Sequence, residues 1–151
     1  MRIKATQVYR GRNIYSHKLV IKMTLDLEEY YDVPTKAVNG FNEGLLRYLP
    51  GLKDHRCSAG KEHGFLDRLS EGTYPAHVAE HSILEVQNML GFDVKYGKAR
   101  VTSNERVYDV IYQYGLEKAG ILCGEFVVDM MNSLFRGEDF PFDIRLEGIR
   151  R

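Results

Sequence analysis

The segment from His77 to His81 reads His-Val-Ala-Glu-His and is the part of the chain best suited to metal chemistry. Two histidines four residues apart lie one turn apart on the same face of a helix, so both imidazoles can reach one ion. Glu80, beside them, can take a proton from a metal-bound water. The pattern H-x-x-E-H is that of zinc peptidases of the inverted type. It predicts a zinc site with His77 and His81 as ligands and Glu80 as the catalytic base.

The third ligand of such a site is not defined by the motif. Catalytic zinc takes three protein ligands and keeps one position open for water. Glu85 continues the helix face, but it lies about 12 Å along the axis from His77. His55, Cys57 and His63 come from a glycine-broken stretch that precedes the helix, and they offer imidazole or thiolate. The third ligand therefore stays open among His55, Cys57, His63 and Glu85.

The motif sits in a segment with clear helix signals at both ends. Thr73 can cap a helix, and Pro75 suits the first turn. The helix is predicted to run to about Leu90, where Gly91 supplies a left-handed stop. The segment from Thr73 to Leu90 is therefore predicted to be one continuous helix that carries the whole motif.

This predicted helix has two unlike faces. At about 100° per residue, the motif histidines fall nearly opposite an apolar stripe. We therefore expect the core to leave the histidines at the surface. The alternative to a metal site is then a solvated polar face on which His and Glu pair along the helix. The stripe consists of Ala79, Ile83, Val86 and Leu90, and the opposite face carries His77, His81 and Glu85.

The other predicted elements give the fold class. Their order contains no strand-helix-strand alternation, which favours α+β with a small antiparallel or mixed sheet of about four strands and helices mainly on one side. The predicted strands are Ile3 to Tyr9, Lys18 to Leu27, Val94 to Thr102 and Val107 to Tyr114. The other predicted helices are Asn39 to Leu49 and Glu117 to Phe135, and Leu52 to Gly72 is predicted to be a loop with one helical turn at Phe65 to Leu69.

Length and charge narrow the function classes. The 151 residues predict a single domain over residues 1–151. Twenty-one basic and 21 acidic side chains cancel, which argues against a nucleic-acid or anionic-membrane partner. No apolar run reaches the roughly 18 residues of a membrane span, and residues 1–10 lack the apolar core of a signal peptide. We therefore expect a cytoplasmic protein. The chain has no GxxxxGK, GxGxxG or GxSxG motif.

Short segments spread over much of the chain carry a family resemblance. Together they resemble the N-terminal domain of the cyanophycin synthetases, which build multi-L-arginyl-poly-L-aspartate. The segments are Arg10-Gly11, Asn13, Tyr15-Ser16, Leu25-Asp26-Leu27-Glu28, Gly40-Phe41, Glu43-Gly44-Leu45, Leu49-Pro50, Leu52, His55, Cys57-Ser58, Gly64-Phe65, Glu71-Gly72-Thr73, His77 to Glu85, Gln87, Gly97, Arg100, Val107-Tyr108, Val110 and Tyr112.

The resemblance implies a domain that holds the growing polymer and, in some members, trims it at a metal-dependent peptidase site. His77, Glu80 and His81 match that site, and Arg100 matches a nearby substrate-binding arginine. In the family an ATP-grasp domain and a Mur-ligase-like domain follow and use ATP with magnesium. Both domains are absent from these 151 residues, so we expect an excised part of a synthetase. The expected partners are cyanophycin and the ligase domains of the same parent chain.

Two other readings of the motif remain. One is a non-catalytic polymer-docking domain with an empty metal site, in which charged residues such as Arg100 hold the polymer. The other is an unrelated small zinc hydrolase with a different substrate. Metal content and the ability to cut cyanophycin distinguish the three.

Overall fold

The sheet forms one layer of the molecule. In residues 1–56 and 60–151, which the computed structural model describes, four antiparallel strands pair in the order β1-β2-β4-β3. This topology makes β1 and β3 the two edges and places β2 and β4 in the middle. The strands are β1 Arg2–Tyr9, β2 Val20–Asp26, β3 Gly97–Val101 and β4 Val107–Gln113.

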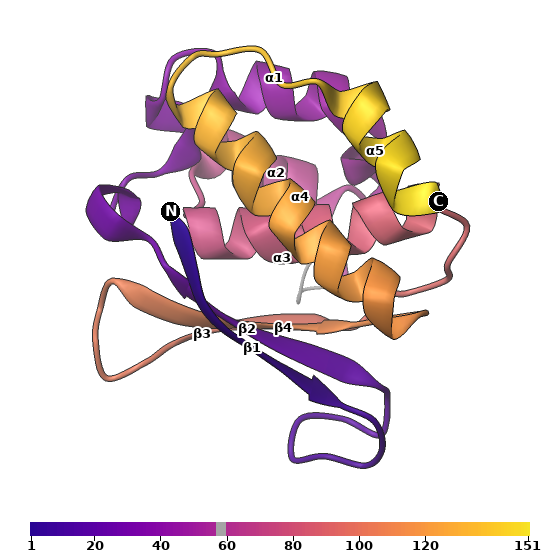
Figure 1. Ribbon diagram of the computed structural model, residues 1–151. Coiled ribbons are helices and arrows are strands. Elements are labelled where there is room, and N and C mark those ends of the chain that lie inside the picture. Colours follow the sequence, from indigo (N-terminus) through magenta and orange to yellow (C-terminus); the bar gives the residue numbers. More distant parts are fainter. Residues whose placement is uncertain (57–59) are drawn as a thin grey trace.

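The helices form the second layer and lie on one side of the sheet (Figure 1). The long helices α3 and α4 pack against each other and against the strands, while the shorter helices cover them. The α+β class and the one-sided arrangement are therefore confirmed. The helices are α1 Phe41–Tyr48, α2 Gly64–Glu71, α3 Pro75–Met89, α4 Glu117–Phe135 and α5 Phe142–Arg150, with single-turn 3-10 elements η1 Glu28–Tyr30, η2 Thr35–Ala37 and η3 Pro50–Asp54.

The core lies between the layers. Strand β4 contributes Val110 and Tyr112, and the Tyr112 hydroxyl donates a hydrogen bond to the Gly120 carbonyl of α4 at 2.9 Å. From α4, Cys123, Val127, Met130 and Leu134 form an apolar stripe that is buried in the same cluster. The side of β4 that carries Val110 and Tyr112 therefore packs inward.

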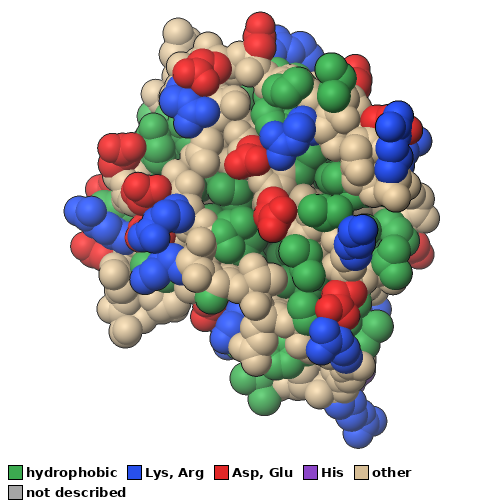
Figure 2. All heavy atoms as spheres, in the orientation of Figure 1, with side chains coloured by type: hydrophobic (Ala, Val, Ile, Leu, Met, Phe, Trp, Pro, Cys, Tyr) green, Lys and Arg blue, Asp and Glu red, His purple; other side chains and the backbone are tan. Residues whose placement is uncertain are grey.

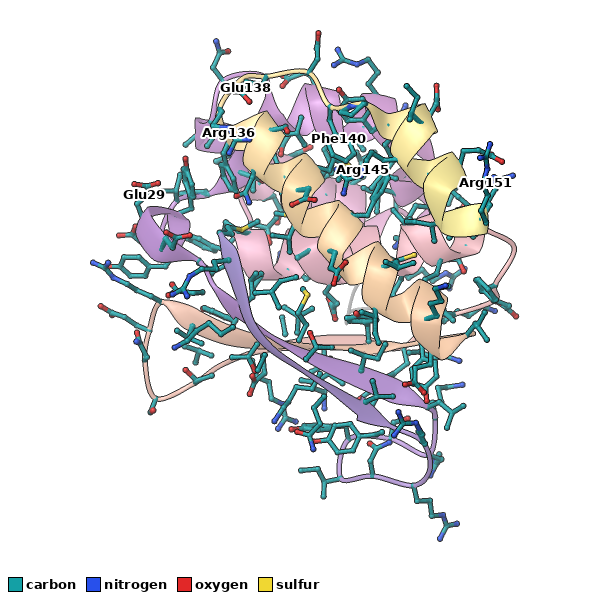
Figure 3. All side chains as sticks on the ribbon, viewed as in Figure 1. Glu29, Arg136, Glu138, Phe140, Arg145 and Arg151 are labelled. Carbon is teal, nitrogen blue, oxygen red and sulfur yellow. The ribbon has the colours of Figure 1, made fainter. Side chains whose placement is uncertain are left out.

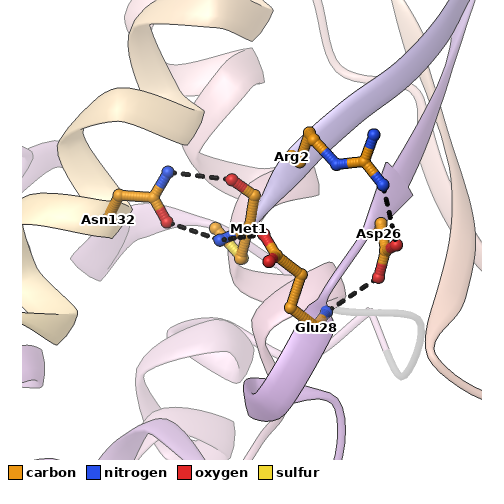
Figure 4. A network of polar contacts seen from close by, with 5 residues as sticks. All are labelled: Met1, Arg2, Asp26, Glu28 and Asn132. Carbon is orange, nitrogen blue, oxygen red and sulfur yellow. Dashed lines mark hydrogen bonds and ion pairs between the residues drawn. The ribbon is translucent and has the colours of Figure 1, made fainter.

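Polar contacts tie the first strand to the last long helix (Figure 4). The Met1 ammonium donates to Asn132 Oδ1 at 2.7 Å and lies 3.4 Å from Glu28 Oε1. Asn132 returns a hydrogen bond to the Met1 carbonyl at 3.0 Å. On the neighbouring strand pair, Arg2 lies 3.4 Å from Asp26. These contacts fix the start of β1 against α4.

Helix α5 was absent from the predicted elements. Phe142 and Leu146 are buried and Ile149 packs against the core. The spacing of these apolar residues is typical of one face of a helix. Arg145 holds this helix to α4: its guanidinium donates to Asp129 at 2.7 Å and lies 5.3 Å from the centre of the Phe140 ring (Figure 3).

Two predicted segments differ in extent from the structure. The expected single turn at Phe65 to Leu69 is the longer helix α2, and the expected strand Val94 to Thr102 shortens to β3. On the face shown in Figure 2, basic and acidic side chains are interspersed. None of the described helices is both long and apolar enough to cross a lipid bilayer.

Candidate metal site

Helix α3 carries the predicted motif and has the predicted limits. It begins at Pro75 and ends at Met89, and Gly91 follows with φ 97°. Thr73 does not cap it, because the N-cap position is Tyr74 and no side-chain cap bond forms. The Thr73 hydroxyl instead shares a hydrogen bond with His77 Nδ1 at 2.8 Å. This contact leaves His77 Nε2 directed to the rest of the motif.

The expected solvent exposure of the motif face is wrong. Glu80 is 7% exposed and His81 is 8% exposed. The reason is the segment before α3, which was predicted as a loop but folds over this face. Its Phe65 stacks on the His81 ring with centroids 4.2 Å apart and meets His77 edge-on at 5.3 Å. The motif therefore lies in a largely desolvated environment.

The three motif side chains converge. One ligand atom from each of His77, Glu80 and His81 can be chosen so that all lie within 4.8 Å of one another. Glu80 Oε2 lies 3.5 Å from His81 Nε2 and 4.0 Å from His77 Nε2. The two imidazole nitrogens are ligands that suit zinc, and the carboxylate beside them can act as a base or as a further ligand.

Burial sets the protonation of the group. Desolvation, with help from the nearby Arg68 charge, lowers the pKa of His77 to about 4. Desolvation, followed by the neighbouring His77, His55 and Arg68, lowers the pKa of His81 to about 2. Desolvation raises the pKa of Glu80 to about 7. Both imidazoles are therefore neutral near pH 7, as metal ligands must be, and the metal-free Glu80 titrates near neutrality.

The candidates for a third ligand occupy different places. His55 Nδ1 lies 3.1 Å from His81 Nδ1, on the opposite edge of that ring from Glu80. Glu85 contacts His55 Nε2 at 2.9 Å. His63 is exposed and its Nδ1 bonds the Lys53 carbonyl at 2.6 Å. Cys57 lies outside the described residues. Within the described part of the chain, no further His, Cys, Asp or Glu joins the three-residue group.

The group opens into a cavity of about 580 Å³ beside β3 and β4. Its described lining contains Glu80 as the single acidic residue, together with the basic residues Arg56, Arg68 and Lys95, while Lys98 borders it from β3 with a side chain on the other side of the strand. An adjoining cavity of about 400 Å³ shares Arg56, His81 and Lys95 and adds Asp54. The buried carboxyl thus faces a predominantly cationic hollow that continues past His81.

Strand β3 forms a close wall of this cavity. A Cβ at Gly97 would lie 2.8 Å from Glu80 Cγ, so only glycine lets the strand pass at this distance. Because side chains alternate along a strand, Ala99 shares this side, and Arg100 is on the opposite one. Arg100 is exposed, stands across from Asp109 and lies outside the described lining of the cavity.

Sequence reasoning missed Phe65, Arg68 and Gly97 as parts of this site. Phe65 and Arg68 lie one turn apart on α2, and a two-turn helix there would have placed both toward one neighbour. An isolated glycine within a strand is itself a signal of close approach by another group.

The fold and site define a class: a small α+β domain whose central helix presents two imidazoles and a carboxyl to a basic cavity. Residues 22–136 match the family described as the cyanophycin synthase-like N-terminal domain. The chain belongs to this family, which confirms the resemblance drawn from its sequence.

Relatives in this family are much longer. A cyanophycin synthetase from Geminocystis herdmanii is 41% identical over 145 residues, which are 95% of this chain and 17% of the relative. One from Synechocystis sp. is 42% identical over 142 residues, 93% of this chain and 16% of the relative. One from Crocosphaera subtropica is 38% identical over 143 residues. The chain thus spans about a sixth of the length of these relatives.

Proposed function

We propose that this chain is a polymer-binding domain of a cyanophycin synthetase that holds the arginyl-aspartate polymer and trims it at a zinc-dependent peptidase site. The observation that carries the proposal is the convergence of His77, Glu80 and His81 within 4.8 Å in a protein of this family. ATP and magnesium would act in the ligase domains of the parent chain, which are the expected intramolecular partners.

The cavity chemistry supports such a polymer. Cyanophycin carries a carboxylate and a guanidinium on every repeat. Arg56, Arg68 and Lys95 offer cationic partners to carboxylates at the cavity, and Asp54 offers an acceptor to a guanidinium in the adjoining hollow. A partner for this polymer needs local charges of both signs and no large net field, which agrees with the zero formal charge.

Each motif residue has a role in hydrolysis. His77 and His81 would hold the ion through their Nε2 atoms, because Thr73 and His55 engage their Nδ1 atoms. Zinc would supply Lewis acidity at the scissile carbonyl and toward water. Glu80 takes a proton from the attacking water and delivers it to the leaving amine. A carboxylate beside the ion is placed to make both transfers.

Arg100 has a separate proposed role. It lies on the other side of β3 from Glu80, so it would hold polymer outside the cavity. Replacement of Arg100 should then weaken polymer binding without a change in zinc content.

The decisive test replaces Glu80 with glutamine. Glu80→Gln should abolish release of short chains from purified cyanophycin while zinc still binds, because the amide cannot take a proton. Chain length by gel electrophoresis and metal content by mass spectrometry measure the two effects, with the exposed Glu71→Gln as the matched control. Unchanged cleavage in Glu80→Gln would exclude the catalytic role.

Two other outcomes identify the remaining alternatives. Loss of zinc in Glu80→Gln would make Glu80 a ligand and not the base. A wild-type domain that binds cyanophycin but takes up no zinc would be the docking domain with an empty metal site.

A further inference from the structure

Behind the metal-facing edge of His81 lies a chain of three polar side chains. Glu85 Oε1 lies 2.9 Å from His55 Nε2, and His55 Nδ1 lies 3.1 Å from His81 Nδ1. His81 and Glu85 come from successive turns of α3, and His55 follows η3. Side-chain exposures of 15% for His55 and 13% for Glu85 show that this chain is largely buried, with His55 and His81 bordering the cavity of about 400 Å³.

The chemistry of the three groups gives the chain a direction. An ionised carboxylate only accepts hydrogen bonds, so His55 Nε2 carries the hydrogen that Glu85 receives. When the His55 ring carries a single hydrogen, its other nitrogen is then an acceptor, so His55 Nδ1 receives the hydrogen of His81 Nδ1. This tautomer leaves the lone pair on His81 Nε2, the nitrogen that lies 3.5 Å from Glu80. The carboxylate thereby selects the tautomer of a ring it does not touch.

The backbone holds the middle of this chain in place. The His55 amide donates to the Leu52 carbonyl, and the His55 carbonyl receives the Phe65 amide, both at 3.2 Å. Phe65 in turn stacks on the His81 ring. The Glu85 carboxylate lies directly over Gly51, in space that any Cβ at this position would occupy. Segments on both sides of residue 55 thus fix the two rings relative to each other.

His55 and Glu85 are placed to support His81 and not to join it as ligands. An ion at the motif would meet His81 on its Nε2 edge, whereas His55 contacts the Nδ1 edge of the same ring. Metal-ligating histidines commonly donate their second ring nitrogen to such an outer partner, which fixes orientation and raises ligand basicity.

We propose that Glu85 and His55 are positioning residues that lock His81 in the Nδ1–H tautomer, with Nε2 presented to the ion. This inference rests on the proposed function, because it gives the pair a purpose at the zinc site. It converts two candidates for the third ligand into outer partners of the proposed ligand His81. The tautomer itself is a property of the metal-free protein.

The first experiment therefore reads the tautomers without metal. Two-bond ¹H–¹⁵N spectra of the imidazoles in the metal-free chain should show His81 as the Nδ1–H form and His55 as the Nε2–H form. In Glu85→Ala the His81 signals should move toward a mixture of tautomers. A wild-type His81 with hydrogen on Nε2 would overturn the inference.

The second experiment measures zinc affinity by competition with a chromophoric chelator. Glu85→Ala and His55→Ala should each bind zinc roughly 10–100-fold more weakly than wild type. Glu85→Gln should recover most of the loss, because its amide oxygen still accepts from His55. The exposed residues Glu71 and His17 provide matched controls, and their alanine variants should bind zinc as wild type does.

The outcomes separate this inference from the proposed function. Normal zinc binding in both alanine variants would overturn the positioning role and leave the metal site intact. Complete loss of zinc in His55→Ala, with no recovery in any conservative variant, would make His55 a ligand and also overturn it. Thermal unfolding of each metal-free variant shows whether the fold persists, and Glu85→Gln keeps the test valid if Glu85→Ala does not fold.

Discussion

Helices α3 and α4 lie side by side on the same sheet, yet they bury different kinds of side chain. The interior of α4 is apolar, with Phe126, Met130 and Met131 almost fully buried and Ser133 as its buried polar residue. Helix α3 also buries apolar residues such as Val78, Ile83 and Val86, but among them it buries Glu80, His81, Ser82 and Gln87. Both helices thus supply packing energy, and α3 in addition places ionisable groups where water is scarce.

The difference has an energetic meaning. Removing apolar surface from water stabilises the fold, whereas burying an ionisable group costs free energy unless it becomes neutral or finds a partner. The lowered histidine pKa values and the raised pKa of Glu80 record this cost in α3. Helix α3 therefore carries the ionisable groups whose burial costs free energy. The apolar packing of α4 helps to offset that cost.

The largest expected effect is the loss of packing in α4. Phe126 is 1% exposed and makes edge-to-face contacts with Phe140 and Phe142. Phe126→Ala should lower the free energy of unfolding by about 3–5 kcal/mol, because it removes a large buried ring and leaves a cavity. Urea unfolding measures this loss, with Ile144→Ala, at a position 79% exposed, as the control. A loss no larger than that of the control would remove the assigned role of α4.

An opposite effect is expected at Glu80 in the metal-free protein. The pKa of Glu80 rises from 4.5 to about 7, so between these pH values the folded protein holds a proton that the unfolded chain has released. Stability from this group is thus lost as pH rises through this window. Glu80→Gln avoids the loss and should be more stable than wild type at pH 8, by at most about 3 kcal/mol.

The pH dependence is the sharper part of this test. At pH 5 the folded forms of both proteins carry a neutral group at position 80, so the difference between them should shrink to about 1 kcal/mol or less. Urea unfolding of wild type and Glu80→Gln at the two pH values measures it. An equal difference at pH 5 and pH 8 would mean that Glu80 is not held in a desolvated state.

The smallest expected effect is at the wall of the cavity. Gly97→Ala places a methyl group 2.8 Å from Glu80 Cγ and should destabilise the metal-free domain by about 1 kcal/mol. Gly148→Ala in α5 is the matched control, since a Cβ there meets nothing within 4 Å, and it should be neutral or slightly stabilising. Equal thermal unfolding of the two variants would show that β3 does not constrain Glu80.

Local patterns predicted most of the fold. Helix α3 has its limits near the predicted positions because proline and glycine act on their own backbone, which needs no knowledge of tertiary structure. The burial of His81 was not predictable in this way, because it depends on Phe65 from a segment broken by glycines. The prediction of a polar helix face was correct, but its expected exposure to solvent was not, because the segment that carries Phe65 covers it.

In the candidate site, too, contacts within one helix were predictable and contacts between distant segments were not. The spacing of His77, Glu80 and His81 follows from one helix, and the structure brings them together as that spacing predicts. The contacts of His55 with His81 and Glu85 join residues 26 and 30 positions apart. No periodicity relates such positions. The sequence could therefore name these residues as candidates, but it could not show which of them contact each other.

The position of β3 at the edge of the sheet has a consequence for association between molecules. An edge strand exposes unpaired backbone groups that can pair with the same strand of a second copy. Lys98 and Arg100 alternate onto one side of β3, so pairing of two such edges would bring like charges together. This repulsion disfavours dimers and aggregates through β3, and it keeps the edge beside Glu80 accessible.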